Sequence, residues 1–291
     1  MNKKIALITC WYGPYPWYFP YFVHTVWFSL TIDFIIVTDN TEKIPNKPDN
    51  LKIIYRTMDE LKDDFSSKLG FIVTIDSPFK LCDFKPAYGF LFQDIISDYD
   101  FWGHTDLDII YGDVRGFMTD ELLQSYDVIS CRHDYTAGYF TLYRNNDYCN
   151  MLFTKSNAYQ AVLSTPKNYW FDECGMFTGK VNFNHSSTVA KKNNRQANIL
   201  DFPNAFQSMT YVVVKAVKDD GLKAYFDFIV LDGAVGDISW KDGKVYYKDT
   251  FEAMFYHLIL FKKKCIKKTA LSPIPNEFFF TTNDVYEKLP E

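Results

Sequence analysis

Several sequence signatures of well-known protein classes are missing from this chain of 291 residues. No stretch reaches the roughly 18 to 20 uninterrupted apolar residues that a membrane-spanning helix needs, so we expect a soluble protein. No Gly-x-Gly-x-x-Gly motif follows the first predicted strand, which argues against a dinucleotide-dependent oxidoreductase. The nucleophile element Gly-x-Ser-x-Gly, typical of α/β-hydrolases, is also absent.

Paired cysteine motifs are missing as well. The six cysteines are scattered and none forms a Cys-x-x-Cys pair, so neither a zinc site nor a compact disulfide framework is indicated. Reduced thiols fit a cytoplasmic location best.

An excess of positive charge is also lacking, since the formal net charge is -5. A protein that binds nucleic acid without sequence preference needs a basic face to neutralise phosphates, so we expect no nucleic-acid partner. The one basic run comprises Lys262, Lys263 and Lys264, followed by Lys267 and Lys268. Such a run is usually a solvated face. The alternative is peripheral contact with an anionic membrane surface, which would be the inner face of the cell membrane.

Apolar and aromatic residues are abundant. Hydrophobic residues make up 47% of the chain and charged residues 23%, which is enough to bury a large core and is unlike a disordered chain. Aromatic residues reach 19%, and most of them are expected in the core, with a minority available to stack on a nucleobase or a sugar ring.

Short apolar strands alternate with helical segments in the first half. Buried strands are predicted at 4–10, 33–39 and 51–55, and a crossover helix at 20–30. Pro86 suits the first turn of a helix that would run to about Ser97. This alternation predicts an α/β fold with a mainly parallel central sheet.

The second half has a different character. Its predicted elements are strands at 127–131 and 138–143, a helix at 150–164 and a hairpin at 240–247 with Asp242-Gly243 as its turn. Residues 178–198 are polar and without periodicity, which predicts a mobile surface loop. No repeat or low-complexity linker divides the chain, so we expect one domain over 1–291, with a nucleotide-binding half (1–135) and an acceptor-side half (136–291).

The most informative motif is Asp106-Leu107-Asp108, which follows the apolar stretch from Phe101. Ligands bind at the carboxyl ends of strands in α/β sheets, and alternation along an extended chain would place both carboxylates on one side. Two such oxygens can hold Mn²⁺ or Mg²⁺ and leave positions for substrate phosphates. The structural alternative is that Asp106 caps a turn while Asp108 pairs with a nearby Lys or Arg.

The segment from Lys80 to Gly89, together with Phe101-Trp102-Gly103 and the run from Asp106 to Asp113, resembles a bacterial family of glycosyltransferases associated with surface polysaccharides. The resemblance is best from Lys80 to Arg144. More remotely, the layout is similar to enzymes of the glycogenin and galactinol-synthase kind. It implies a GT-A fold and the transfer of a sugar from a UDP- or GDP-sugar to a hydroxyl of a glycan or lipid-linked saccharide.

The resemblance also implies roles near the C-terminus. Those enzymes have a late His as a further metal ligand, and His257 occupies the matching position. A His in an apolar stretch is otherwise a hydrogen-bonded core residue, and both interpretations stay open. A Lys after that His contacts the diphosphate in such enzymes, which Lys262 or Lys263 would do here.

Further donor-site candidates lie near the predicted strand ends. Lys85 precedes a predicted helix start, where a cation favours phosphate, and Asp83 is a weaker candidate beside it; alternatively the two pair on the surface. Trp11 lies where GT-A folds contact the nucleobase, although core packing also explains it. Asp39 ends the second strand and suits either a ribose contact or a turn.

The resemblance extends to the acceptor side. Ala137-Gly138-Tyr139 is similar to the strand that borders donor and acceptor, with Gly138 permitting close approach. Asp172 and Glu173 supply the next carboxylates, one of which would bind sugar hydroxyls or remove the acceptor proton as general base. A helix-start acidic pair is the alternative.

Two other function classes fit parts of the sequence. A metal-dependent phosphoesterase would need more clustered ligands than appear near Asp106. A non-catalytic carbohydrate-binding protein would use the abundant Trp and Tyr, and its binding would not depend on metal.

Overall fold

The computed structural model describes residues 3–174, 199–201, 207–227 and 229–288. Contacts between Cα atoms divide the chain into two compact units. The first comprises residues 1–55, 105–123 and 228–291, and the second comprises 56–104 and 124–227. The loop predicted at 178–198 lies outside the described residues.

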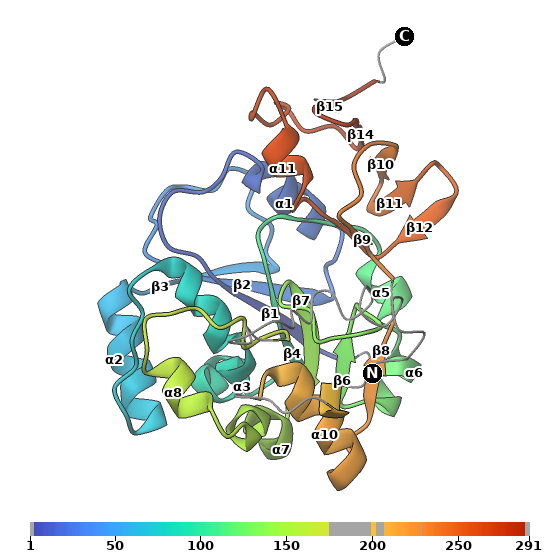
Figure 1. The fold of residues 1–291 in the computed structure, drawn as a ribbon. Coiled ribbons are helices and arrows are strands. Elements are labelled where there is room, and N and C mark those ends of the chain that lie inside the picture. Colours follow the sequence, from blue (N-terminus) through green and yellow to red (C-terminus); the bar gives the residue numbers. More distant parts are fainter. Residues whose placement is uncertain (1–2, 175–198, 202–206, 228, 289–291) are drawn as a thin grey trace. The chain divides into compact units, whose positions relative to one another are not determined.

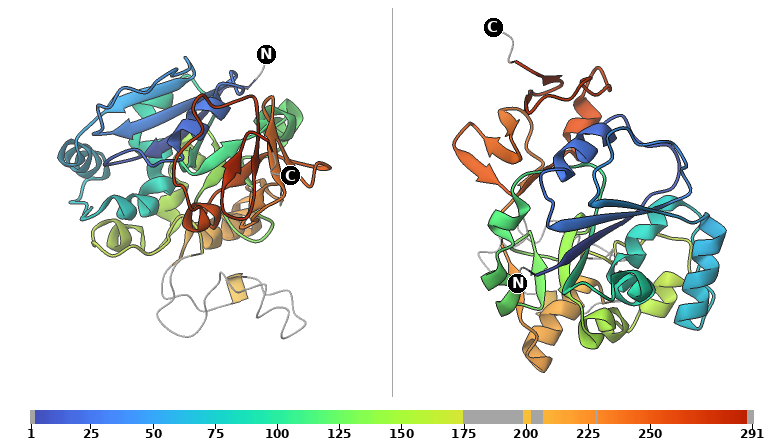
Figure 2. Two further views of the ribbon diagram at one scale, coloured as in Figure 1. Left: turned by 90° about the horizontal axis from the view of Figure 1, so that it is seen from above. Right: turned by 180° about the vertical axis from the view of Figure 1, so that it is seen from behind.

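In the first unit, three parallel strands form the chain's first sheet segment (Figure 1). They lie in the order β3-β2-β1, with β1 at Ile5–Cys10, β2 at Ile32–Thr38 and β3 at Leu51–Tyr55. Parallel pairing joins Ile5 to Ile32 and Phe34 to Leu51. The blue strands in both views of Figure 2 are these three. Helix α1 (Phe19–Val26) connects β1 to β2, and its buried side chains include Tyr21 and Phe22.

The first unit also holds two smaller sheets. One has the order β5-β13-β9, with β5 at Ile109–Tyr111, β13 at Phe255–His257 and β9 at Leu231–Asp232. The other has the order β12-β11-β10-β14-β15, whose strands are Phe251–Ala253, Lys244–Tyr247, Ile238–Lys241, Glu277–Phe280 and Val285–Tyr286. The unit's short helices are α5 (Val114–Phe117), α6 (Asp120–Ser125) and α11 (Phe261–Lys264). The last two residues of α6 belong to the second unit.

The first unit is held together by an aromatic core. Trp240 stacks on Phe278 with ring centroids 5.0 Å apart, and its indole N–H donates to the Tyr111 carbonyl at 2.8 Å. Tyr21, Tyr256 and Phe261 are buried in the same cluster. Many aromatic residues were expected in the core, and in this unit large rings do form it.

The second unit contains strands in the order β4-β7-β6-β8. These are β4 (Phe101–Thr105, whose last residue belongs to the first unit), β7 (Phe140–Arg144), β6 (Val128–Ser130) and β8 (Ala224–Phe226). Strand β6 pairs antiparallel with β7 and parallel with β8. Its helical elements are α2 (Met58–Leu69), η1 (Pro78–Ala87), α3 (Tyr88–Leu91), α4 (Gln93–Ile96), α7 (Asp147–Asn150), η2 (Leu152–Lys155), α8 (Tyr159–Leu163), η4 (Ile199–Asp201) and α10 (Met209–Asp220).

The predicted fold class is confirmed, because the chain combines α and β elements and three of the four strand pairs named in these sheet segments are parallel. The hairpin at 240–247 is also confirmed. Asp242 and Gly243 both have positive φ, 45° and 86°, as a type I′ turn requires.

Two predicted helices are interrupted. Instead of one helix from Pro86 to Ser97, a 3-10 helix holds Pro86 near its end, and the short helices α3 and α4 follow. The helix predicted at 150–164 is split into η2 and α8. Ser156 breaks it, because its backbone is extended and its hydroxyl donates to the Gln207 carbonyl at 2.6 Å.

Helix α2 was not predicted, although its start has a clear sequence signal. Thr57 and Glu60 form a capping box, in which the Thr57 hydroxyl accepts from the Glu60 N–H and the Glu60 carboxylate accepts from the Thr57 N–H. The pattern Thr-x-x-Glu before an apolar position would have identified it. Gly70, with a φ of 74°, ends the helix.

Among the described residues, no helix combines the length and the apolar composition needed to cross a membrane.

Candidate functional site

The acidic motif lies in a turn between β4 and β5 in the first unit. Strand β4 ends at Thr105, Asp106 follows in irregular backbone, and Leu107 and Asp108 form the turn before Ile109. The motif thus follows a buried strand as predicted, but the carboxylates are placed by the turn and not by alternation along a strand.

The register of the small sheet explains which residues meet Asp108. His257 in β13 pairs with Ile109 on one side and with Asp232 in β9 on the other. The backbone ladder continues beyond the strands, since the Leu258 N–H donates to the Asp108 carbonyl at 2.8 Å. Because paired residues on neighbouring strands are close, this register brings Asp108, His257 and Asp232 together.

The imidazole of His257 bridges two carboxylates. Its Nε2 is 3.3 Å from Asp108 Oδ2, and its Nδ1 is 3.0 Å from Asp232 Oδ1. The His257 side chain is only 4% exposed and that of Asp108 7%. The sequence analysis missed Asp232, and the only signal for it was a carboxylate at the end of a short apolar stretch.

Lys262 completes the group. It lies in α11, which begins four residues after His257, and its Nζ donates to Asp108 Oδ2 at 2.6 Å. The Lys262 ammonium also lies 5.8 Å from the centre of the Tyr18 ring. The predicted late His and the Lys after it are thus both next to Asp108. The alternative given from sequence, that Asp108 pairs with a nearby Lys or Arg, is met as well.

Electrostatics reflect this crowding. Burial disfavours the charged form of His257, but Asp108 and Asp232 outweigh it and raise the pKa of His257 to about 9. Burial likewise opposes ionisation of Asp108, yet His257 and Lys262 hold the pKa of Asp108 far below its usual range. The pKa of Tyr18 is raised by burial first and then by Asp108 and Asp106, so both carboxylates of the motif act on one hydroxyl.

The donor set suits a divalent cation. Carboxylate oxygens and a neutral imidazole nitrogen are ligands of Mn²⁺, so a cation bound here would take the place of the proton on His257 Nε2. A carboxylate on the second ring nitrogen fixes the orientation of a ligating His. Asp232 has that position on Nδ1, which leaves Nε2 aimed at Asp108. Within the described part of the chain, no three His, Cys, Asp or Glu side chains form a group that could hold a metal ion as they stand.

Two further candidates in the first unit stabilise the loop after β1. The Trp11 indole donates to the Pro14 carbonyl at 3.1 Å. Asp39 is exposed, and its Oδ1 accepts from the Gly13 N–H at 3.1 Å. The Asp39 contact fits the turn interpretation given from sequence, whereas Trp11 is only half-buried and supports its loop instead of packing in the core. A ribose or base contact by either residue stays a prediction.

A second group of candidates meets inside the second unit. Lys85 is buried, and its Nζ donates to the Gly138 carbonyl at 2.8 Å and lies 3.9 Å from Asp172 Oδ2. The Gly138 N–H donates to Glu173 Oε1 at 2.9 Å. Four residues predicted separately, Lys85, Gly138, Asp172 and Glu173, are therefore neighbours.

Two sequence interpretations for this group are wrong in detail. Lys85 is not at a helix N-terminus but near the end of η1, and it is not a surface residue paired with Asp83. Asp83 pairs instead with Lys80 at 2.7 Å, and both side chains are fully buried. Asp83 also accepts from the Tyr169 and Phe171 N–H groups, so its contacts anchor the segment that leads to Asp172.

His104, which the sequence analysis did not select, contacts this group from β4. Its Nδ1 lies 2.9 Å from the Gly138 carbonyl, which also accepts from Lys85. Burial and the nearby Lys85 charge hold the pKa of His104 well below its usual value, so the ring is neutral. Nδ1 is then the donor, since a carbonyl can only accept.

Glycine is required at position 138. A Cβ there would collide with Asp172 Oδ2 and press on Glu173 Oε1 at 3.0 Å. We expect Gly138→Ala to lower the free energy of unfolding by about 1–3 kcal/mol, as overpacking does. Urea denaturation would measure it. Adding Asp172→Ala removes the colliding atom, so the double variant should recover part of the loss; an unchanged loss would contradict this explanation.

None of the curated proteins matches the chain. Among solved structures, the apo form of mouse xyloside xylosyltransferase 1 is similar, with 11% sequence identity and a TM-score of 0.39, over 88% of this chain and 97% of that one. A family model matches residues 7–289, and the chain therefore belongs to DUF6625, a family of unknown function.

Proposed function

We propose that this protein is a metal-dependent glycosyltransferase of the GT-A type that uses Mn²⁺ or Mg²⁺ and a nucleotide-diphosphate sugar. The observation that carries the proposal is the contact of Asp108 with His257 and Lys262, a pair of neighbouring residues about 150 positions further along the chain. A lone Asp-x-Asp motif occurs often by chance. An Asp-x-Asp joined to a buried His and a Lys is a far more specific arrangement.

Asp106, Asp108 and His257 would hold the cation in this proposal. A divalent cation, when bound, neutralises the charge that develops on a departing diphosphate. Asp232 would orient the His257 ring through Nδ1. Lys262, now paired with Asp108, is near enough to the same position to donate to a diphosphate oxygen.

The acceptor in this proposal is a hydroxyl group of a glycan or a lipid-linked saccharide. Of the two predicted carboxylates, Asp172 is buried and lies next to Lys85, whereas Glu173 is half-buried. A general base must reach the proton that it removes, so Glu173 is the better candidate and Asp172 the better positioning residue. A role in surface polysaccharide synthesis is part of the proposal.

The test is calorimetric titration with UDP- and GDP-sugars in the presence and absence of Mn²⁺. The proposal expects at least one sugar nucleotide to bind, with slow hydrolysis of the donor, and expects both to require the metal. Glycan binding that is indifferent to metal would favour a carbohydrate-binding protein instead. Hydrolysis of simple phosphodiesters would favour a phosphoesterase.

Asp232 offers a specific prediction because it contacts His257 without being a proposed ligand. We expect Asp232→Asn to weaken Mn²⁺ binding roughly 10- to 100-fold, since the amide is a poorer partner for the ring N–H. Calorimetric titration with Mn²⁺ alone measures this. Asp237→Asn, in the same stretch of chain, is the control and should bind as the native protein does. Equal affinities for all three proteins would contradict the role of Asp232.

Peripheral membrane contact is also part of the proposal, with a cytoplasmic location at the inner membrane face. In and after α11, exposed lysines alternate with exposed apolar side chains: Leu260, Lys263, Lys264, Ile266 and Lys268. Each Lys near an anionic membrane surface contributes about 1 kcal/mol to the free energy of binding. Exposed apolar side chains strengthen the binding further by inserting into the interface.

Vesicle binding tests this contact. We expect Lys263→Gln with Lys264→Gln to reduce binding to phosphatidylglycerol vesicles roughly thirtyfold. Lys241→Gln with Lys244→Gln, in the β10–β11 hairpin, removes the same charge and should change binding little. Sedimentation with vesicles measures both. Equal binding to phosphatidylcholine vesicles would contradict an electrostatic contact.

A further inference from the structure

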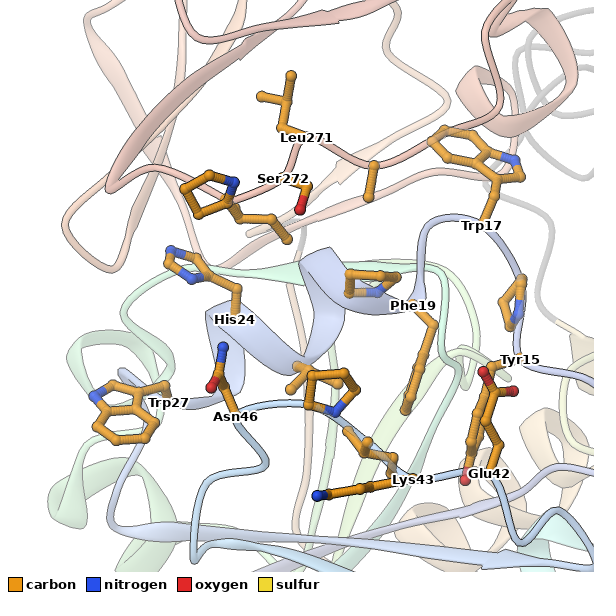
Figure 3. A pocket seen from close by; sticks show the side chains of 18 of the residues that line it. Tyr15, Trp17, Phe19, His24, Trp27, Glu42, Lys43, Asn46, Leu271 and Ser272 are labelled. Carbon is orange, nitrogen blue, oxygen red and sulfur yellow. The ribbon is translucent and has the colours of Figure 1, made fainter.

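Tryptophan side chains reach the surface in both units, and the backbone distinguishes them. In the first unit, the exposed Trp27 borders a cavity of about 700 Å³ beside α1, across from Tyr15 (Figure 3). Trp27 ends α1 with an ordinary helical φ of -54°. In the second unit, Trp170 is half-buried and has a φ of 50°. A bulky residue in this left-handed region is strained, because its Cβ crowds the following carbonyl oxygen.

Hydrogen bonds hold the strained backbone of Trp170 from both sides. The N–H groups of its two neighbours, Tyr169 and Phe171, donate to the buried Asp83 carboxylate at 2.9 Å each. The Trp170 N–H itself donates to the side-chain oxygen of Asn168, also at 2.9 Å. Strain that the surrounding structure maintains in this way occurs most often at functional positions.

Packing does not explain why this position holds a tryptophan. Trp170 meets Phe79 edge to face, with ring centroids 6.0 Å apart, but Phe79 exposes 56% of its surface. The Asn168 amide donates to the Phe79 carbonyl at 2.9 Å and so ties the backbones of the two rings together. Glycine would adopt the same φ without strain. A residue that breaks a local rule with so little packing in return points to a function of its side chain.

The aromatic pair lies on the turn that carries the predicted acceptor-side carboxylates. The Glu173 N–H donates to the Trp170 carbonyl at 3.2 Å, so these two residues belong to one turn, with Asp172 between them. A sugar ring presents a face of C–H groups and an edge of hydroxyl groups. An aromatic ring can pack against the face, and carboxylate oxygens accept hydrogen bonds from the hydroxyl groups. The turn therefore has both kinds of group that a saccharide needs.

We propose that Trp170 and Phe79 form a stacking platform for a sugar ring of the acceptor. The inference rests on the proposed function and deepens it, because it makes the acceptor a saccharide that is bound by its ring and not only by its hydroxyl groups. Stacking fixes the position of the ring, which favours the approach of one hydroxyl group to Glu173, the candidate general base. Neither platform residue is a proposed ligand of the metal ion.

The experiment is calorimetric titration of the full chain with oligosaccharides of glucose, galactose and N-acetylglucosamine, in the presence of Mn²⁺ and UDP. We expect at least one of them to bind, and Trp170→Ala to weaken that binding roughly tenfold through the lost stacking. Trp170→Phe keeps an aromatic ring and should lose no more than about threefold. Trp27→Ala is the matched control, because it removes an exposed indole from the first unit, and it should bind as the native protein does.

Thermal unfolding tests the strain separately. Trp170→Gly should melt about 2–4 °C above Trp170→Ala, because both variants lack the ring and only glycine relieves the left-handed backbone. At Trp27 the order should reverse, since glycine is less stable than alanine in a helical conformation.

The proposal is overturned if none of the oligosaccharides binds, if Trp170→Ala binds them as tightly as the native chain, or if Trp170→Gly melts no higher than Trp170→Ala. Weaker UDP binding in Trp170→Ala would also overturn it, by assigning the ring to the nucleotide. Failure of the proposed function would look different, as an absence of Mn²⁺-dependent binding of sugar nucleotides to the native protein.

Discussion

Asp108→Asn is expected to reduce Mn²⁺-dependent binding and turnover of the sugar nucleotide by at least about a hundredfold, because Asp108 is the residue on which the proposed metal site converges. Its Oδ2 is 3.3 Å from His257 Nε2 and 2.6 Å from Lys262 Nζ. An amide keeps the shape of the side chain but loses the negative charge that a cation needs. Since mutating a residue that only orients a ligand costs 10- to 100-fold, removing the ligand itself should cost more.

The control for this variant is Asp113→Asn, five residues after Asp108. Asp113 caps α5 by accepting from the Gly116 N–H at 2.9 Å, and Asn caps helices as well as Asp does. Titration of donor with Mn²⁺, and rates of donor hydrolysis, should separate the two variants. Thermal unfolding of each shows whether the fold is intact. A folded Asp108→Asn protein with native affinity and rate would refute the proposed function.

The second large effect concerns stability. Asp83→Ala is expected to lower the free energy of unfolding by about 3–5 kcal/mol, because it leaves the Lys80 ammonium buried without its counter-ion. Lys80 also donates to the Val162 and Lys167 carbonyls, so the charge is held in place and cannot move to solvent. Burial raises the pKa of Asp83, although the Lys80 charge opposes it.

A surface pair provides the comparison. Lys52 and Asp33 are also 2.7 Å apart, but their side chains are 48% and 27% exposed. Asp33→Ala should therefore cost about 1 kcal/mol or less. Denaturant unfolding of both variants gives the two values.

A double replacement tests the cause. Lys80→Met combined with Asp83→Leu should recover part of the loss, because no charge remains buried. The recovery is only partial, since Asp83 also accepts from the Tyr169 and Phe171 N–H groups. Equal losses for Asp83→Ala and Asp33→Ala would show that the burial of the pair is unimportant.

The sequence by itself determined the local elements that repeat a simple pattern. Strand β3 was predicted at its observed bounds, and β1, β2 and the 240–247 hairpin within two residues, because their apolar runs and turn residues are local signals. It also placed Asp106 and Asp108 directly after a buried strand. The 3-10 helix η1 escaped prediction, because Pro86 suggested the start of a helix, whereas the structure has Pro86 near the end of η1.

Only the tertiary structure decided which predicted residues act together. Asp232 and His257 are 25 positions apart, and their contact depends on the register of β13 against β9, which no local pattern specifies. The partner of Asp83 was decided by the local backbone: in the 3-10 helix η1, Lys80 lies three residues before Asp83 on the same side, whereas Lys85 donates to the Gly138 carbonyl. Side-chain chemistry is written in the sequence, whereas the distances that make it a site come from strand pairing and packing between distant segments.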